Sequence, residues 1–236
     1  MYDRLIHFNP CDGIELKHKD LNAPQKAQYL PKKLIKPFLE MVKKRDIHQY
    51  YMFRTMIETG IRVGEANALQ WSDYNSKNKT LSITKSYDQN HGRWNTTKNK
   101  EHRTIYITDD LAKELTKLKY LQNANRIVNE DIYNQAYDFI FCNAFGEPLP
   151  RSTTHNTMMY VTEKLLGKDN KLSIHKLRHT HATLLLESDV PMKVIQEQLG
   201  HKTMAVTEQV YSHVIEKMNQ KAKENFEKYI NKKNIF

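Results

Sequence analysis

The stretch IHQYYMFRTMIETGIRVGEANALQWSD, residues 47–73, decides the fold, because one helix is expected to end in it and another to begin. Its first half is largely apolar and predicts a helix that Gly60 can terminate as a left-handed cap. VGEANALQW predicts a short helix with Glu65 in its first turn, where a carboxylate suits the positive end of the helix dipole. Arg62 lies between Gly60 and Gly64, so the backbone can hold it while its guanidinium projects outward.

The patterns on either side of this stretch predict an α+β domain that is mostly helical. PKKLIKPFLEMVKKRD (31–46) has the period of an amphipathic helix, and Pro37 is expected to distort its first turns. TLSITKS (80–86) and RTIYIT (103–108) alternate apolar and polar residues and predict strands of a small antiparallel sheet. The basic segment DQNHGRWNTTKNK (88–100) between them is rich in turn residues. Further helices are expected at about 109–126, 152–166, 175–187, 191–199, 204–210 and 214–230.

The remaining segments set the expected domain limits. DFIFCN (138–143) is compatible with a short strand or a buried loop. Residues 1–29 show no sustained helical or strand period and are interpreted as an N-terminal tail or linker. We therefore expect residues 30–236 to form one domain that ends with the helix at 214–230.

The chain is basic, with 37 Lys and Arg against 27 Asp and Glu and a net charge of +10 among 236 residues. The positive excess is concentrated in residues 77–103 and 214–236. Such an excess favours a polyanionic partner, although a solubilising surface explains a single basic run equally well. Nucleic acid is favoured only if chemistry elsewhere in the chain requires it.

Several classes of protein are disfavoured by what the sequence lacks. Two cysteines are too few for a disulfide framework, which suits a reducing cytoplasm. The chain contains no GxxxxGK[ST], HExxH or CxxC motif, and His175 and His179 have no third metal ligand at a recognised spacing. We therefore expect no metal, nucleotide or other cofactor. No apolar run approaches the ~20 residues of a membrane span, so no membrane association is expected.

Polar residues that could take part in catalysis lie at the predicted helix boundaries. HKLRHTHATLL places His175 and Arg178 three positions apart at the start of a helix, and therefore on one face. His201 directly follows Gly200, which is the expected C-terminal cap of the preceding helix. Tyr211 lies ten residues further on. Each residue alone has an ordinary explanation, such as a surface histidine or a packing tyrosine.

In combination, these blocks resemble the catalytic domain of the tyrosine recombinase, or phage integrase, family. The resemblance covers about residues 31–216. It rests on TGIRVGEANALQWSD, the basic strand-turn segment, HKLRHTHATLLLE and IQEQLGHKTMAVTEQVYSHV, which occur in this order. It implies the α+β fold of these DNA breaking and rejoining enzymes, and it interprets residues 1–29 as the remnant of a core-binding domain.

The resemblance also implies a role for each matching residue. Arg62 and Arg178 correspond to the phosphate-binding arginines, with Glu65 in support, and His175 corresponds to the histidine of the HxxR motif. His201 matches the second histidine position, and Tyr211 matches the nucleophile.

Lys98, five residues before Arg103, matches the lysine of the hairpin, with Lys100 as the weaker alternative. His179 and His181 are interpreted as structural. The residues expected to contact DNA are Arg62, Lys98, Lys100, Arg103 and Arg178.

The implied function is that of a site-specific recombinase or integrase of a phage or mobile element. Such an enzyme cleaves and rejoins DNA through a 3′-phosphotyrosyl intermediate, without metal or ATP. The alternatives are a type IB topoisomerase-like enzyme and a non-catalytic DNA-binding relative. The expected partners are double-stranded attachment or recombination sites and accessory DNA-bending proteins. A homo-tetramer on DNA is expected through the C-terminal helix (214–230), in the cytoplasm of a bacterial cell.

Overall fold

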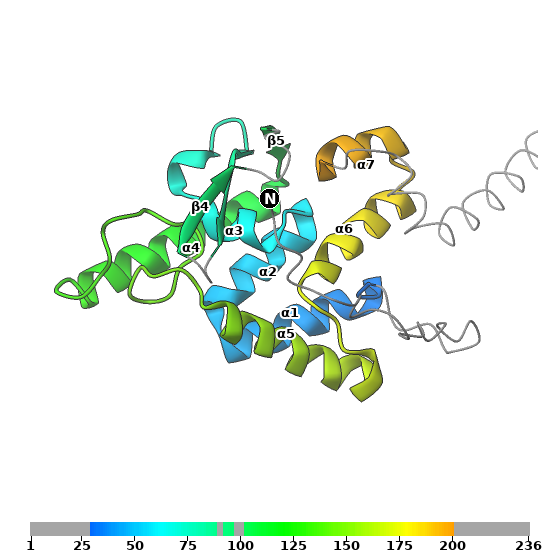
Figure 1. The fold of residues 1–236 in the computed structure, drawn as a ribbon, viewed down its shortest axis with the longest axis horizontal. Helices are drawn as coiled ribbons and strands as arrows, with labels where there is room; N and C mark the ends of the chain where they lie inside the picture. Colours follow the sequence, from blue (N-terminus) through cyan, green and yellow to red (C-terminus); the bar gives the residue numbers. More distant parts are fainter. Residues whose placement is uncertain (1–28, 89–91, 97–101, 201–236) are drawn as a thin grey trace, which may run out of the picture.

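The computed structural model describes residues 29–88, 92–96 and 102–200 (Figure 1). The predicted helices at 204–210 and 214–230, and the tail before residue 29, lie outside these ranges. The helices are α1 (Lys32–Arg45), α2 (Ile47–Thr59), α3 (Val63–Ala68), α4 (Asp109–Val128), α5 (Arg151–Leu166), α6 (His175–Glu187) and α7 (Met192–Leu199), with 3-10 turns at Trp71–Asp73 and Lys168–Asn170. The strands are β1 (Tyr74–Asn75), β2 (Thr80–Ile83), β3 (Lys85–Asp88), β4 (Arg93–Thr96) and β5 (Arg103–Tyr106).

Helix α2 is the central element of the core, and it contacts α1, α4 and α6. The Asp46 side chain caps its start by accepting hydrogen bonds from the backbone N–H groups of His48 and Gln49. Met52 and Phe53 are fully buried in its middle. The helix ends at Gly60 with φ +67°, which confirms the predicted left-handed cap.

Helix α1 continues through Pro37 from Lys32 to Arg45. The residues Phe38 and Val42 on its apolar face are fully buried, and α1 packs against α2 and α5. The amphipathic period thus correctly predicted both the helix and its buried face.

The strands form two antiparallel units. β2 pairs with β5, with Leu81 opposite Ile105, and β1 completes a three-stranded sheet, which confirms the predicted small sheet. TLSITKS was expected to be one strand, but it is divided between β2 and β3. The prediction failed because β3 leaves the sheet to pair with β4, with Tyr87 opposite Trp94.

The β3–β4 hairpin occupies part of the segment that was expected to be a basic turn. The rings of Tyr87, Trp94, Tyr137 and Phe139 pack together and hold it against the segment 138–143, in which residues 139–142 are buried. That segment forms isolated bridges at Phe139 and Cys142, in agreement with a buried loop. The predicted class, a mostly helical α+β fold with a small antiparallel sheet, is confirmed.

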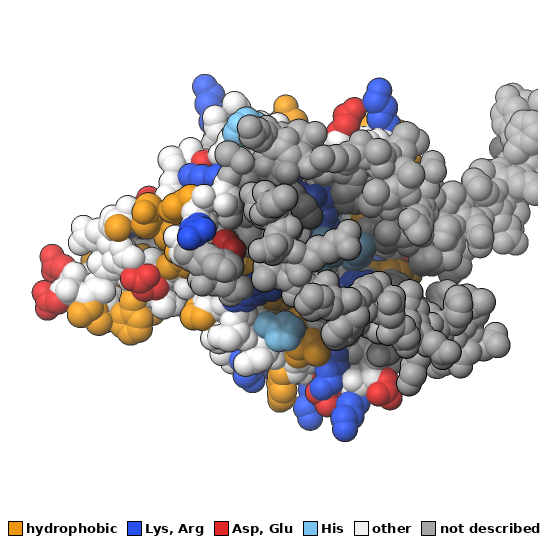
Figure 2. All heavy atoms as spheres, viewed as in Figure 1, with side chains coloured by type: hydrophobic (Ala, Val, Ile, Leu, Met, Phe, Trp, Pro, Cys, Tyr) orange, Lys and Arg blue, Asp and Glu red, His pale blue; other side chains and the backbone are white. Residues whose placement is uncertain are grey.

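The far end of α4 and the loop after it lie at the left of Figure 1, and Figure 2 shows exposed hydrophobic side chains at this end. They include Ile127, Val128 and Ile132. This end of the molecule lies away from α6 and α7 (Figure 1).

None of the helices in the described ranges is both long and apolar enough to cross a membrane.

Gly60 provides a test of the fold at the point where α2 ends. A Cβ at Gly60 would lie 2.6 Å from His181 Cδ2 and 2.7 Å from Leu199 Cδ2, in a left-handed backbone conformation. We expect Gly60→Ala to lower the free energy of unfolding by about 2–3 kcal/mol, through strain and overpacking. Urea denaturation measures the loss.

Gly92→Ala is the matched control for this substitution. Gly92 has φ +59°, and a Cβ there would meet no atom within 4 Å. It should therefore lose only about 1 kcal/mol, the cost of the left-handed conformation. Equal losses in the two variants would show that contacts with α6 and α7 do not require a glycine at position 60.

Candidate active site

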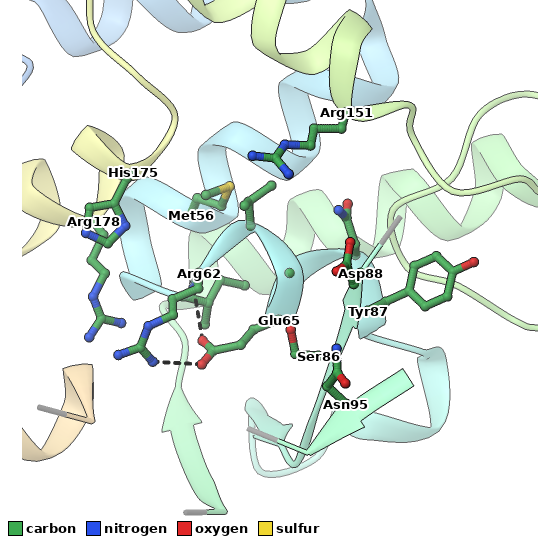
Figure 3. Close-up of a pocket in the computed structure, with 14 residues that line it drawn as sticks. Met56, Arg62, Glu65, Ser86, Tyr87, Asp88, Asn95, Arg151, His175 and Arg178 are labelled. Carbon is green, nitrogen blue, oxygen red and sulfur yellow. Dashed lines mark hydrogen bonds and ion pairs between the residues drawn. The ribbon is translucent and has the colours of Figure 1, made fainter. Parts of the chain in front are cut away.

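A cavity of about 560 Å³ lies between the start of α3, the β3–β4 hairpin, and the starts of α5 and α6. Figure 3 shows Arg62, His175 and Arg178 at one end of it, and Ser86 and Asn95 at the other. The sequence predicted the first three as site residues, and the structure brings them together from segments more than 100 positions apart.

Arg62 is the residue that precedes α3, and a reciprocal arrangement with Glu65 holds it there. The backbone N–H of Arg62 donates to Glu65 Oε2 at 2.9 Å, and its Nη1 donates to Oε1 at 3.0 Å. Its Nη2 donates to the backbone oxygen of Gly200 at 3.3 Å. The Arg62 side chain remains 29% exposed and lines the cavity. The ion pair with Glu65 therefore leaves the guanidinium accessible from the cavity.

Glu65 is buried and accepts from a second arginine as well. Arg103 in β5 donates from Nη1 to Oε1 at 3.1 Å and from Nη2 to Oε2 at 2.6 Å, a bidentate geometry. Burial would raise the pKa of Glu65, but the hydrogen bonds and charges of Arg103, and then those of Arg62, outweigh it. The pKa of Glu65 is therefore lowered, and its carboxylate is charged at neutral pH.

Arg178 occupies the first turns of α6 and is 2% exposed. Its Nη1 donates to the backbone oxygen of Gly60 at 2.9 Å, and its Nη2 donates to that of Leu199. These bonds join α6 to the ends of α2 and α7. Arg178 also lines the cavity (Figure 3), so a buried guanidinium faces the same space as Arg62.

The histidines of α6 divide into two environments. His175 lines the cavity, and its ring packs edge-on against His179, with 5.0 Å between the ring centroids. His181 is buried beneath Gly60, and its Nδ1 lies 3.0 Å from the backbone oxygen of Ile57. Burial lowers the pKa of His181 to about 4, so the ring is neutral. This environment supports the structural interpretation of His181.

Arg103 differs from Arg62 and Arg178, which were also expected to contact DNA, because it is not among the residues that line the cavity. Its side chain is 12% exposed, and its guanidinium is bound to Glu65 and to the backbone oxygen of Gln198. The strand alternation contains a signal for this placement, because Arg103 shares the inward face of β5 with Ile105. This packing role of Arg103 was not predicted from the sequence.

Other cavity residues had no recognisable sequence signal. Ser86, Asp88, Asn95 and Arg151 line the cavity but were absent from the predicted site (Figure 3). They come from the hairpin and from the start of α5, and only the tertiary packing brings them beside α3 and α6. Four predicted residues, Lys98, Lys100, His201 and Tyr211, lie outside the described residues.

The described part of the site is suited to bind an anion. Three arginines, Arg62, Arg151 and Arg178, line one cavity together with the imidazole of His175, and guanidinium geometry matches the oxygens of a phosphate. The described residues contain no group of three His, Cys, Asp or Glu side chains that could hold a metal ion.

Sequence comparison identifies the family to which this fold and its arginine-histidine cavity belong. Residues 28–218 match the phage integrase family, so the chain belongs to it. It is 34% identical over 178 residues to the integrase of Staphylococcus phage L54a, covering 73% of this chain and 49% of that protein. It is 26% identical over 236 residues to tyrosine recombinase XerC of Pediococcus pentosaceus, covering 95% of this chain and 68% of that protein.

The fold also matches solved structures. One is the Tn1549 transposon integrase in complex with transposon right end DNA, with a TM-score of 0.63 and 18% identity. That match covers 81% of this chain and 64% of the integrase chain. The present chain thus spans about half of the phage relative and about two thirds of the other two proteins.

The Glu65 ion pairs predict how stability depends on pH. Because the folded-state pKa of Glu65 is lowered, its contribution is present above the ordinary glutamate pKa of about 4.3 and lost as the pH falls below it. Glu65→Gln should cost about 3–5 kcal/mol at pH 7, since two arginines lose their buried anion. Urea denaturation of both proteins from pH 7 to pH 3.5 should show this difference shrinking at the acid end. A difference that does not depend on pH would contradict the ion-pair assignment.

Proposed function

We propose that this chain cleaves and rejoins DNA as a site-specific recombinase, through a covalent 3′-phosphotyrosyl intermediate. The observation that carries the proposal is the convergence of Arg62, His175 and Arg178 on one cavity, in a chain of the phage integrase family. These three residues match the family motifs in TGIRVGE and HKLRH.

The chemistry of a phosphodiester explains the need for two arginines. Its negative charge repels a nucleophile, and further charge develops on the non-bridging oxygens in the transition state. Arg62 and Arg178 stay protonated at any working pH and can donate to these oxygens in pairs. Their anchors on Glu65 and on backbone oxygens fix both guanidinium groups before the substrate binds, as preorganised catalysis requires.

In the covalent step, His175 acts together with residues that lie outside the described ranges. The phenolic oxygen of Tyr211 attacks the phosphorus, the P–O5′ bond breaks, and the departing 5′ oxygen takes a proton from Lys98, with Lys100 as the alternative acid. His175 accepts the phenolic proton, since its ordinary pKa of about 6.5 is close to working pH. His201 adds a further donor to the phosphate oxygens. The phosphotyrosyl bond conserves the energy of the phosphodiester, so a 5′-hydroxyl can rejoin the strand without ATP.

We further propose that the DNA is an attachment or recombination site of a phage or other mobile element. The names of the relatives, a phage integrase and a transposon integrase bound to transposon end DNA, support this choice. The positive charge of the chain suits a polyanionic partner and predicts salt-dependent binding. Assembly of a homo-tetramer on DNA through residues 214–230, with accessory DNA-bending proteins, belongs to the same proposal.

Tyr211→Phe tests the nucleophile. The variant should bind DNA with wild-type affinity but form no covalent complex with a nicked suicide substrate, because phenylalanine has no attacking oxygen. Denaturing gel electrophoresis detects the adduct. An adduct that persists in Tyr211→Phe would show that Tyr211 is not the nucleophile. Relaxation of supercoiled plasmid by the wild type without site preference would favour a topoisomerase.

Arg62→Lys tests the guanidinium fork. The variant keeps the charge but loses the planar fork that binds both Glu65 and a phosphate, so cleavage should fall on the order of 10²-fold or more. Single-turnover cleavage of the suicide substrate measures the loss. Arg126→Lys is the matched control, because Arg126 is an exposed arginine on α4 that pairs with Asp138. Near-normal cleavage by Arg62→Lys would contradict the fork argument.

A further inference from the structure

The end of α7 is held by an unusual set of contacts. Three consecutive backbone oxygens, those of residues 198–200, each accept a hydrogen bond from a different arginine. Arg103 Nε donates to Gln198 O at 3.1 Å, Arg178 Nη2 donates to Leu199 O, and Arg62 Nη2 donates to Gly200 O at 3.3 Å. We call these three contacts the arginine clamp. The arginines come from β5, from α6 and from the residue before α3, so the clamp joins α7 to three other parts of the fold.

The clamp has a clear electrostatic basis. The last carbonyl groups of a helix have no partners within the helix and form the negative end of its dipole. α7 has eight residues and ends at Gly200 in the left-handed conformation. Three guanidinium groups at this end satisfy its carbonyl oxygens and place positive charge where the dipole favours it.

Apolar packing holds α7 through few residues. Ile195 and Leu199 are its buried side chains, and they belong to a small cluster with Ala182 and Leu186 of α6. This cluster is separate from the main core of α1 to α6. The position of α7 relative to α3 and β5 therefore depends strongly on the clamp.

Arg103 is the clamp residue that the proposed chemistry does not use. The residues that line the cavity include Arg62 and Arg178 but not Arg103. Its contacts are instead both oxygens of Glu65, which in turn hold Arg62, and the backbone oxygen of Gln198. Arg103 thus joins the carboxylate that orients Arg62 to the end of α7.

We propose that Arg103 is a positioning residue, which fixes Arg62 through Glu65 and holds the end of α7 against Arg62. This inference rests on the proposed recombinase function and deepens it. Gly200 is followed in sequence by His201, so the clamp sets the point from which the chain continues toward two predicted catalytic residues. The role differs from a DNA contact, because all three guanidinium nitrogens of Arg103 donate hydrogen bonds within the protein.

The first test needs no DNA. Hydrogen-deuterium exchange of the amides at 195–200 is compared in the wild type, Arg103→Gln and Arg103→Lys. Both variants lose the bond from Nε to Gln198 O, so exchange there should accelerate about tenfold or more, while α2 stays protected. Arg103→Lys keeps a charge near Glu65 and so guards against a variant that fails to fold. Arg126→Gln is the matched control and should exchange like the wild type. Unchanged exchange in both Arg103 variants would overturn the inference.

The second test separates positioning from DNA binding. In single-turnover cleavage of the suicide substrate, the rate at saturating DNA should fall about tenfold or more in Arg103→Lys, with little change in the half-saturating DNA concentration. The acid limb of the pH profile of the cleavage rate should also move to higher pH, because a lysine cannot replace the paired hydrogen bonds by which Arg103 lowers the pKa of Glu65. A raised half-saturating concentration with a normal maximal rate would show instead that Arg103 contacts DNA.

The two tests distinguish failure of the inference from failure of the proposed function. A wild-type chain that forms no covalent adduct would overturn the recombinase proposal and any role of Arg103 in its reaction. The exchange data would still decide whether Arg103 holds α7. Conversely, a wild-type chain that cleaves, with Arg103 variants that cleave and exchange normally, would overturn the positioning role alone.

Discussion

The site depends on the ion pairs that the buried carboxylate of Glu65 forms with Arg62 and Arg103. Three arginines converge near the start of α3, and their mutual repulsion would be costly if no anion lay among them. Glu65 accepts from two of these guanidinium groups with both of its oxygens, and it lies in the first turn of α3, where the helix dipole favours its charge. Its burial makes these contacts stronger than the same ion pair would be in water.

The backbone supplies the remaining acceptors. Gly60 ends α2, and residues 198–200 end α7, so carbonyl groups without helical partners are available at the places where Arg62, Arg103 and Arg178 meet. Carbonyl oxygens orient a guanidinium without cancelling its charge. The site therefore has fixed geometry and retains net positive charge, which is the combination that recognition of a phosphodiester requires.

The sequence predicted some parts of this arrangement better than others. The period of 31–46 and the cap at Gly60 depend on local interactions, and both predictions are confirmed. The division of TLSITKS between two strands was missed, because pairing with β4 and the ring contacts of Tyr87 and Trp94 are not local. The ion pair of Arg103 with Glu65 was also missed, because it joins residues of β5 and α3 that are 38 positions apart in sequence.

The sequence by itself determined the family of this protein, and its motifs predicted Arg62, Glu65, His175 and Arg178 as residues of one site. It also determined the helix boundaries at which these residues lie, since caps and periodicity are local properties of the chain. Only the tertiary structure decided which acceptor each arginine binds, and that Ser86, Asn95 and Arg151 share the cavity. The physical reason is that these contacts join residues far apart in sequence, whose meeting depends on how α3, α6, α7 and the two β units pack.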